Sequence, residues 1–294
     1  MRTRRHNEGM GRRLLVCDID GTLVDDTLTL DDRDVRAVAR AQAAGTLVGV
    51  ATGRMYRSAL PFADRLDVAL PVICYQGAVI RDRPRPGDPL SPLTGTRLGR
   101  LRRECGVGPG LAREVLALAT ARGWTCNVYQ DDQLLVAADT PAVRYYTRIA
   151  RVPITVADDL ADRLGRGSTK MVVVVEPNQA VFAAVVAEVG ELVGARGVVT
   201  RSYPGFCEVT APGVDKGTAL AWVAASVGAA LTDVVAVGDA PNDLALLATA
   251  GTAVAVRTAA AEVRTAADWI TGAPGEGGIA AVVERYQLDD AAAA

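Results

Sequence analysis

The stretch Leu14-Leu15-Val16-Cys17-Asp18-Ile19-Asp20-Gly21-Thr22 decides how this chain folds. Its four apolar residues predict a buried strand, and two aspartates one residue apart follow that strand, before a glycine turn. The carboxyl end of a strand is where ligands bind in an open parallel α/β sheet. Burial gives no reason to place two acids there, so we expect them to serve a phosphate group and a divalent cation.

An Asp-x-Asp pair alone is common in surface turns, so the rest of the chain must support this interpretation. Three further segments follow it in order: Thr52-Gly53-Arg54, Lys216, and Gly238-Asp239-Ala240-Pro241-Asn242-Asp243. Together the four pieces form a set of carboxylates, phosphate donors and one compact positive charge.

The composition limits the class of protein. A chain of 294 residues suggests two domains, and 50% hydrophobic residues suffice for a sizeable core. No apolar run reaches the roughly 18 residues that a membrane helix needs, so we expect no membrane partner. The net charge is -2, without a basic stripe interleaved with aromatic residues, so we expect no nucleic-acid partner. A monomer and a homodimer both remain open.

The scarcity of histidine excludes several mechanisms. The only histidine is His6, in a basic N-terminal segment, so the body of the chain has neither a Ser-His-Asp nor a Cys-His site and no histidine-ligated zinc. Five cysteines form no C-x-x-C pair and are expected to be reduced core residues of a cytoplasmic protein. Carboxylates and a hard cation must therefore carry any catalysis.

Lysine is also scarce, because only Lys170 and Lys216 occur among 32 basic residues. Their survival indicates places where a compact ammonium is preferred to a planar guanidinium. We expect Lys216 to serve the phosphate and Lys170 to touch the substrate, the alternative for Lys170 being a surface role.

Strands and helices alternate in both ends of the chain, which predicts an α/β fold with a Rossmann-like parallel sheet. Hairpin patterns in the middle, such as 125–137, predict an inserted α+β domain. The expected organisation is a core built from 13–82 and 204–288, an insertion at 83–203, and disordered tails at 1–12 and 289–294.

Hydrolysis of a phosphate monoester is the chemistry that these residues suit. A carboxylate nucleophile, Asp18, can form an aspartyl-phosphate, and Asp20 can act as general acid and base. Asp239 fits a ligand of Mg²⁺. Asp243 fits either a further ligand or a residue that holds the ligands in place. Thr52, the Gly53 backbone N–H and Lys216 fit phosphate donors.

The ordered motifs resemble those of the haloacid dehalogenase superfamily, and within it the Cof-type sugar-phosphatase branch. The resemblance is carried by Asp-Ile-Asp-Gly-Thr-Leu at 18–23, Thr-Gly-Arg at 52–54, Asp-Lys-Gly-Thr-Ala-Leu at 215–220 and Gly-Asp-Ala-Pro-Asn-Asp at 238–243. It covers nearly the whole chain, and in that family the inserted cap lies between the second and third motifs. One departure is Gln76-Gly77-Ala78, where this branch usually has Asn-Gly-Ala.

The resemblance implies a Mg²⁺-dependent phosphatase of small phosphorylated metabolites, of the sugar-phosphate kind. Its implied Mg²⁺ ligands are Asp18, the Asp20 backbone carbonyl and Asp239. The implied phosphate-binding groups are the Ile19 backbone, Thr52, Gly53, Lys216 and Asn242.

Three alternatives remain open at this point. Arg54 can be a substrate-side charge or a surface residue at a helix start. A phosphomutase of the same branch would return the phosphate to its substrate rather than release it. A non-catalytic ligand-binding protein could share the fold, although Asp18, Asp20, Lys216 and Asp239 are all present.

Overall fold

The computed structural model describes residues 12–90, 95, 97–150, 152–175 and 178–290. The chain divides into two compact units, one comprising the segments up to Arg102 and from Asp215 onward, the other Arg103–Val214. These bounds differ from the insertion expected at 83–203. The difference at the second boundary has a structural cause, because residues 206–210 pair with a strand of the second unit.

The first unit is built on a parallel sheet of five strands in the order β14-β13-β12-β1-β2. The strands are β1 (Leu14–Cys17), β2 (Leu47–Val50), β12 (Val234–Gly238), β13 (Thr252–Val256) and β14 (Trp269–Thr271). All four residues of β1 are buried, as its apolar sequence requires. The expected parallel α/β fold is therefore confirmed.

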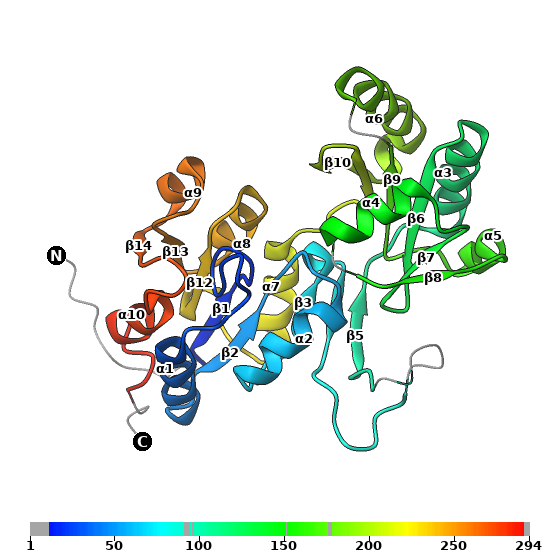
Figure 1. The fold of residues 1–294 in the computed structure, drawn as a ribbon. Helices are drawn as coiled ribbons and strands as arrows, with labels where there is room; N and C mark the ends of the chain where they lie inside the picture. Colours follow the sequence, from blue (N-terminus) through cyan, green and yellow to red (C-terminus); the bar gives the residue numbers. More distant parts are fainter. Residues whose placement is uncertain (1–11, 91–94, 96, 151, 176–177, 291–294) are drawn as a thin grey trace. The chain divides into compact units, whose positions relative to one another are not determined.

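The order of the strands creates a topological switch point at β1. From β1 the chain continues to β2 on one side, whereas β12 lies on the other side (Figure 1). In such sheets ligands bind outside the carboxyl ends of the strands at this point. Asp18 directly follows β1, Thr52 follows β2 by two residues, and Asp239 directly follows β12. Motifs that are far apart in the sequence are thus brought to one edge of the sheet.

The α-helices that accompany this sheet in the described residues are α1 (Asp32–Ala43), α2 (Tyr56–Arg65), α7 (Lys216–Ser226), α8 (Leu244–Thr249), α9 (Ala261–Ala266) and α10 (Gly278–Arg285). Helix α1 packs against α10 and α7 packs against α8. Helix α7 begins with a capping box, in which the Asp215 side chain accepts from the Thr218 backbone at 2.7 Å. That cap sets Lys216 at the first turn of the helix.

A smaller sheet in the order β3-β4-β5 consists of β3 (Val72–Cys74), β4 (Val79–Arg81) and β5 (Leu101–Glu104). Strands β3 and β4 are antiparallel, and a 3₁₀ turn over Tyr75–Gly77 connects them. A parallel bridge between Ala51 and Ile73 joins β3 to the end of β2. This bridge places the 75–77 turn beside the segment 52–54.

The second unit has a six-stranded mixed sheet in the order β10-β11-β9-β6-β7-β8. Its strands are β6 (Thr125–Gln130), β7 (Gln133–Val136), β8 (Ile154–Val156), β9 (Lys170–Val174), β10 (Val198–Tyr203) and β11 (Phe206–Thr210), and its helices are α3 (Pro109–Ala121), α4 (Pro141–Ala150), α5 (Leu160–Arg163) and α6 (Gln179–Val193). Apolar side chains of α3 and α6 form one core with the sheet. The hairpin expected near 125–137 is present, and its turn residues Asp131 and Asp132 have φ of 51° and 57°.

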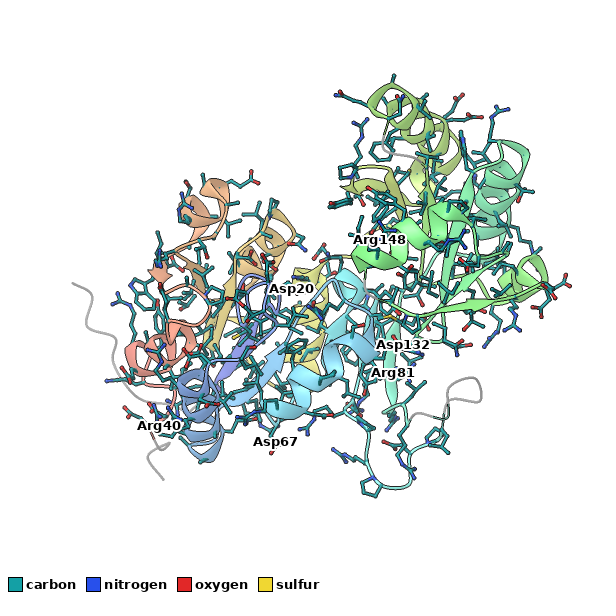
Figure 2. The ribbon with its side chains drawn as sticks, viewed as in Figure 1. Asp20, Arg40, Asp67, Arg81, Asp132 and Arg148 are labelled. Carbon is teal, nitrogen blue, oxygen red and sulfur yellow. The ribbon has the colours of Figure 1, made fainter. Side chains whose placement is uncertain are left out.

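The tails expected at 1–12 and 289–294 fall outside the described residues, except for Arg12, Asp289 and Asp290. Asp289 forms an ion pair of 3.0 Å with Arg40, which Figure 2 labels on α1. Each helix in the described part of the chain is too short or too polar to cross a membrane.

Candidate active site

The loop after β1 brings the first motif against the end of β12. The carbonyl of Ile19 accepts from the backbone N–H of Leu23 at 2.9 Å, which closes the turn. Gly21 has φ of 79°, and a Cβ at this position would lie 2.2 Å from Oδ2 of Asp239. Only glycine therefore allows the loop to approach Asp239 so closely. The neighbouring Thr22 hydroxyl donates to Oδ1 of Asp239 at 3.1 Å.

A buried lysine joins two carboxylates at the centre of the site. Nζ of Lys216 donates to Oδ1 of Asp18 and to Oδ1 of Asp243, both at 2.6 Å. The other oxygen of Asp243 accepts from the backbone N–H groups of Asp239 and Ala240, at 3.0 and 3.1 Å. Both carboxylate oxygens of Asp243 therefore accept hydrogen bonds, one from Lys216 and the other from the loop after β12.

Three acids form a cluster whose composition suits a divalent cation. One carboxylate oxygen from each of Asp18, Asp239 and Asp243 lies within 4.8 Å of the other two. Burial raises the pKa of Asp18 to about 8, although Lys216 opposes the rise. Burial, with the nearby Asp243 carboxylate, raises the pKa of Asp239 to about 6. The three acids offer only oxygen donors, which are those that Mg²⁺ prefers.

Lys216 stays protonated although it is buried. Burial alone would lower its pKa, but the carboxylates of Asp18 and Asp243 raise the pKa above its ordinary value. The lysine is therefore a fixed positive charge directly beside the Asp18 carboxylate.

Asp20, which Figure 2 labels, is exposed, two residues after Asp18. The guanidinium of Arg54 forms a two-pronged ion pair with it, with Nε donating to Oδ2 at 2.7 Å and Nη2 to Oδ1. Arg54 also stacks on the Phe62 ring, 4.9 Å from its centroid. The contact brings Arg54 beside Asp20, and its role toward a substrate stays a prediction.

The other expected phosphate-binding residues lie in the same unit. Thr52 is buried, and its hydroxyl accepts from the Arg54 backbone N–H at 3.1 Å. The exposed Asn242 donates from Nδ2 to Oε1 of Gln76 at 3.2 Å. Gln76 in turn lies over Gly53, because a Cβ on that glycine would meet Nε2 of Gln76 at 2.4 Å.

Lys170 belongs to the second unit. Its ammonium pairs with Glu208 at 3.2 Å and lies 5.0 Å from the centroid of the Tyr129 ring. The expected contact with substrate stays a prediction.

The sequence alone did not indicate a role for two residues that contact the expected site residues. Thr22 was quoted only as part of the first motif, and Gln76 only as a departure from a family pattern. Both act through side-chain hydrogen bonds to partners more than 160 residues away, for which a single sequence carries no signal.

A family profile matches most of the chain. The profile of the haloacid dehalogenase-like hydrolases matches residues 15–90 and 103–283. These ranges contain all four motifs.

Curated relatives match over more than nine-tenths of this chain. A putative phosphatase of Streptococcus pyogenes is 23% identical over 288 residues, covering 95% of this chain and 100% of that protein. A 5-amino-6-(5-phospho-D-ribitylamino)uracil phosphatase of Bacillus subtilis is 24% identical over 296 residues, covering 93% of this chain and 97% of that protein. A chloroplastic endoribonuclease of Arabidopsis thaliana is 23% identical over 298 residues, and the chain spans about half, 48%, of its length.

Solved structures share the fold. A Thermotoga maritima protein is 26% identical with a TM-score of 0.81, covering 93% of this chain and 97% of that one. A sugar phosphatase of haloacid dehalogenase subclass IIB is 21% identical with a TM-score of 0.73, covering 94% and 99%. The resemblance indicated by the motifs, and with it the expectation of an enzyme, is confirmed: the chain belongs to the haloacid dehalogenase-like hydrolase family.

Proposed function

We propose that this hydrolase is a Mg²⁺-dependent phosphatase that releases phosphate from small metabolites of the sugar-phosphate kind through an aspartyl-phosphate on Asp18. The observation that carries the proposal is the buried contact of Lys216 with Asp18 and Asp243, at 2.6 Å each, beside the further carboxylate of Asp239. A nucleophilic carboxylate, a fixed cation and a cation-binding pair of acids are the parts that phosphoryl transfer needs.

Asp18, Asp239 and the Asp20 backbone carbonyl are the groups that would hold Mg²⁺. Their oxygen donors fit the ion, and carboxylate oxygens of Asp18 and Asp239 lie within 4.8 Å of one another. Bound Mg²⁺ would neutralise the non-bridging oxygens of the phosphoryl group. Asp243 is better suited to positioning, because Lys216 and two backbone N–H groups already occupy its oxygens.

The reaction would proceed in two displacements. An oxygen of Asp18 attacks phosphorus as the bond to the leaving oxygen breaks, and the Asp20 carboxylic acid protonates that oxygen. Water then attacks the aspartyl-phosphate while the Asp20 carboxylate accepts its proton, which releases phosphate and restores Asp18. Lys216 supplies positive charge throughout, and the Ile19 and Gly53 backbones with Thr52 and Asn242 would bind the phosphoryl oxygens.

Support for the substrate class comes from relatives. One of them is named for a ribityl phosphate and one similar structure for sugar phosphates. Phosphorylated sugars and sugar alcohols are therefore the first compounds to test.

The test is the release of inorganic phosphate from p-nitrophenyl phosphate and from a panel of sugar phosphates. We expect turnover with Mg²⁺, loss of turnover with EDTA, and poor replacement by Ca²⁺, which prefers more ligands at longer distances. Full activity in chelated, metal-free buffer would contradict the mechanism. Return of the phosphate to a sugar without net release would favour a phosphomutase.

A further inference from the structure

The turn between β3 and β4 has an unusual backbone. Tyr75 and Gln76 are consecutive non-glycine residues with positive φ, 52° and 59°, a conformation that such residues rarely adopt. Backbone bonds tie both to the second motif, from Tyr75 N–H to the Arg54 carbonyl at 2.9 Å and from Gln76 N–H to the Thr52 carbonyl at 3.1 Å. Strained backbone of this kind persists where the surroundings over-determine it, often at functional sites.

The same turn is also packed against the segment that carries Lys216. Gly77 has φ of 103°, and a Cβ there would lie 2.3 Å from the carbonyl oxygen of Asp215. The turn therefore lies between the second and third motifs, in contact with both.

The Gln76 side chain extends this connection to the fourth motif. Its Oε1 accepts from Nδ2 of Asn242 at 3.2 Å, while its Nε2 lies against Gly53. In this arrangement the Oε1 of Gln76 accepts, so the Nδ2 end of the Asn242 amide faces Gln76. One of the two N–H bonds of Asn242 is used in this contact, and the other has no protein partner among the residues that the structure describes, so it can donate to a ligand.

We propose that Gln76 is a positioning residue for phosphate binding, which holds the Asn242 amide with its second N–H toward the phosphoryl group beside Gly53. The proposal rests on the proposed phosphatase function. Asn242 is exposed, so without Gln76 its amide can rotate and must be ordered when phosphate binds. Gln76 lowers that cost by holding the amide in advance.

The experiment measures the binding of inorganic phosphate by titration calorimetry in the presence of Mg²⁺, which needs no turnover. Gln76→Met keeps the length of the side chain and removes its acceptor. We expect phosphate to bind about three- to tenfold more weakly, the effect of one neutral hydrogen bond. Gln287 is the matched control, because it is an exposed glutamine with φ of 53° in the same unit, and Gln287→Met should leave the affinity unchanged.

A double-mutant cycle separates positioning from a general structural effect. If Gln76 acts through Asn242, the Gln76→Met change should have no effect on phosphate affinity in an Asn242→Ala background. An unchanged affinity in Gln76→Met alone, or an equal loss in both backgrounds, would overturn the proposal. A wild-type protein that neither binds phosphate nor hydrolyses p-nitrophenyl phosphate would instead overturn the proposed function itself.

Discussion

Lys216 is a buried charge at the centre of the site, with only 1% of its side chain exposed. Removing one partner of a buried ion pair leaves an uncompensated charge, at a cost of about 3–5 kcal/mol. The arrangement therefore works as a unit, in which Asp243 holds the lysine and the lysine faces Asp18.

Asp18→Asn should abolish turnover and leave the fold intact. The amide can still accept a hydrogen bond from Lys216, but it cannot form an acyl phosphate. Steady-state phosphatase assays, with thermal unfolding to verify the fold, provide the measurement. Activity of the purified variant above a contaminant control would refute Asp18 as the nucleophile.

The two lysines of the chain permit a matched comparison. Lys216→Arg should lower kcat by about a hundredfold or more, as loss of a preorganised charge contact does, because a guanidinium does not fit between two carboxylates that each lie 2.6 Å from Nζ. Lys170→Arg should mainly raise KM, if Lys170 contributes uniform binding of substrate. Kinetic constants on the best substrate of the panel test both, and unchanged constants for Lys170→Arg would return that residue to a purely structural role.

At the scale of elements, α10 depends on α1 for its N-terminal cap. Gly277 precedes the helix and has no side chain to cap it, but the buried Asp34 accepts from the backbone N–H of Ala280 at 2.8 Å. Asp34→Ala should therefore destabilise the protein by about 1–2 kcal/mol, through loss of a cap and a buried hydrogen bond. Urea unfolding at pH 7 measures this difference.

The raised pKa of Asp34 also leads us to expect that the stability of the protein depends on pH. Burial raises its pKa in the folded protein, although the N–H of Ala280 opposes the rise. Between the unfolded pKa, roughly 3.9, and the raised folded value, the folded state binds more protons, so the Asp34 contribution to stability falls as pH rises. Asp34→Asn lacks this penalty and should be more stable than wild type at pH 7, with the difference shrinking toward pH 4.

The control for both Asp34 variants is Asp32→Asn on the same helix. Asp32 pairs with Arg65 at 3.0 Å, but both side chains are more than half exposed, and such pairs contribute little. A stability difference between Asp34→Asn and wild type that did not change with pH would contradict the assignment.

At the scale of the whole molecule, the second unit interrupts the first between two of the motifs. The first unit contains the four motifs and its own sheet, and the second has a separate apolar core. We propose that the second unit acts as a cap that governs the choice of substrate rather than the chemistry, since an inserted domain can close over a site.

Replacing Arg103–Val214 with a Gly/Ser linker should therefore remove discrimination among sugar phosphates and retain some hydrolysis of p-nitrophenyl phosphate. The ranking of substrates by kcat/KM, parent against a soluble variant, is the measurement. A capless variant that kept the parent's ranking would exclude this role.

Much of the architecture could be predicted from the sequence by itself. The strand 14–17 has the bounds that its apolar run indicates, the alternation of strands and helices indicated the parallel sheet, and the ordered motifs indicated the family. These features can be read locally, because the hydrophobic period, the turn residues and the residues within each motif are properties of short stretches of sequence.

Only the tertiary structure decided which side chains meet. Lys216 contacts Asp18 across 198 residues, Asp34 caps a helix 246 residues away, and Gln76 reaches Asn242 across 166 residues. The strand order brings such segments to one edge of the sheet, and the packing of individual side chains then selects the partners. A hydrogen bond between distant residues leaves no periodic pattern in one sequence. In the sequence Gln76 was therefore only a departure from the Asn-Gly-Ala pattern, and only its contacts in the structure connect it with Asn242.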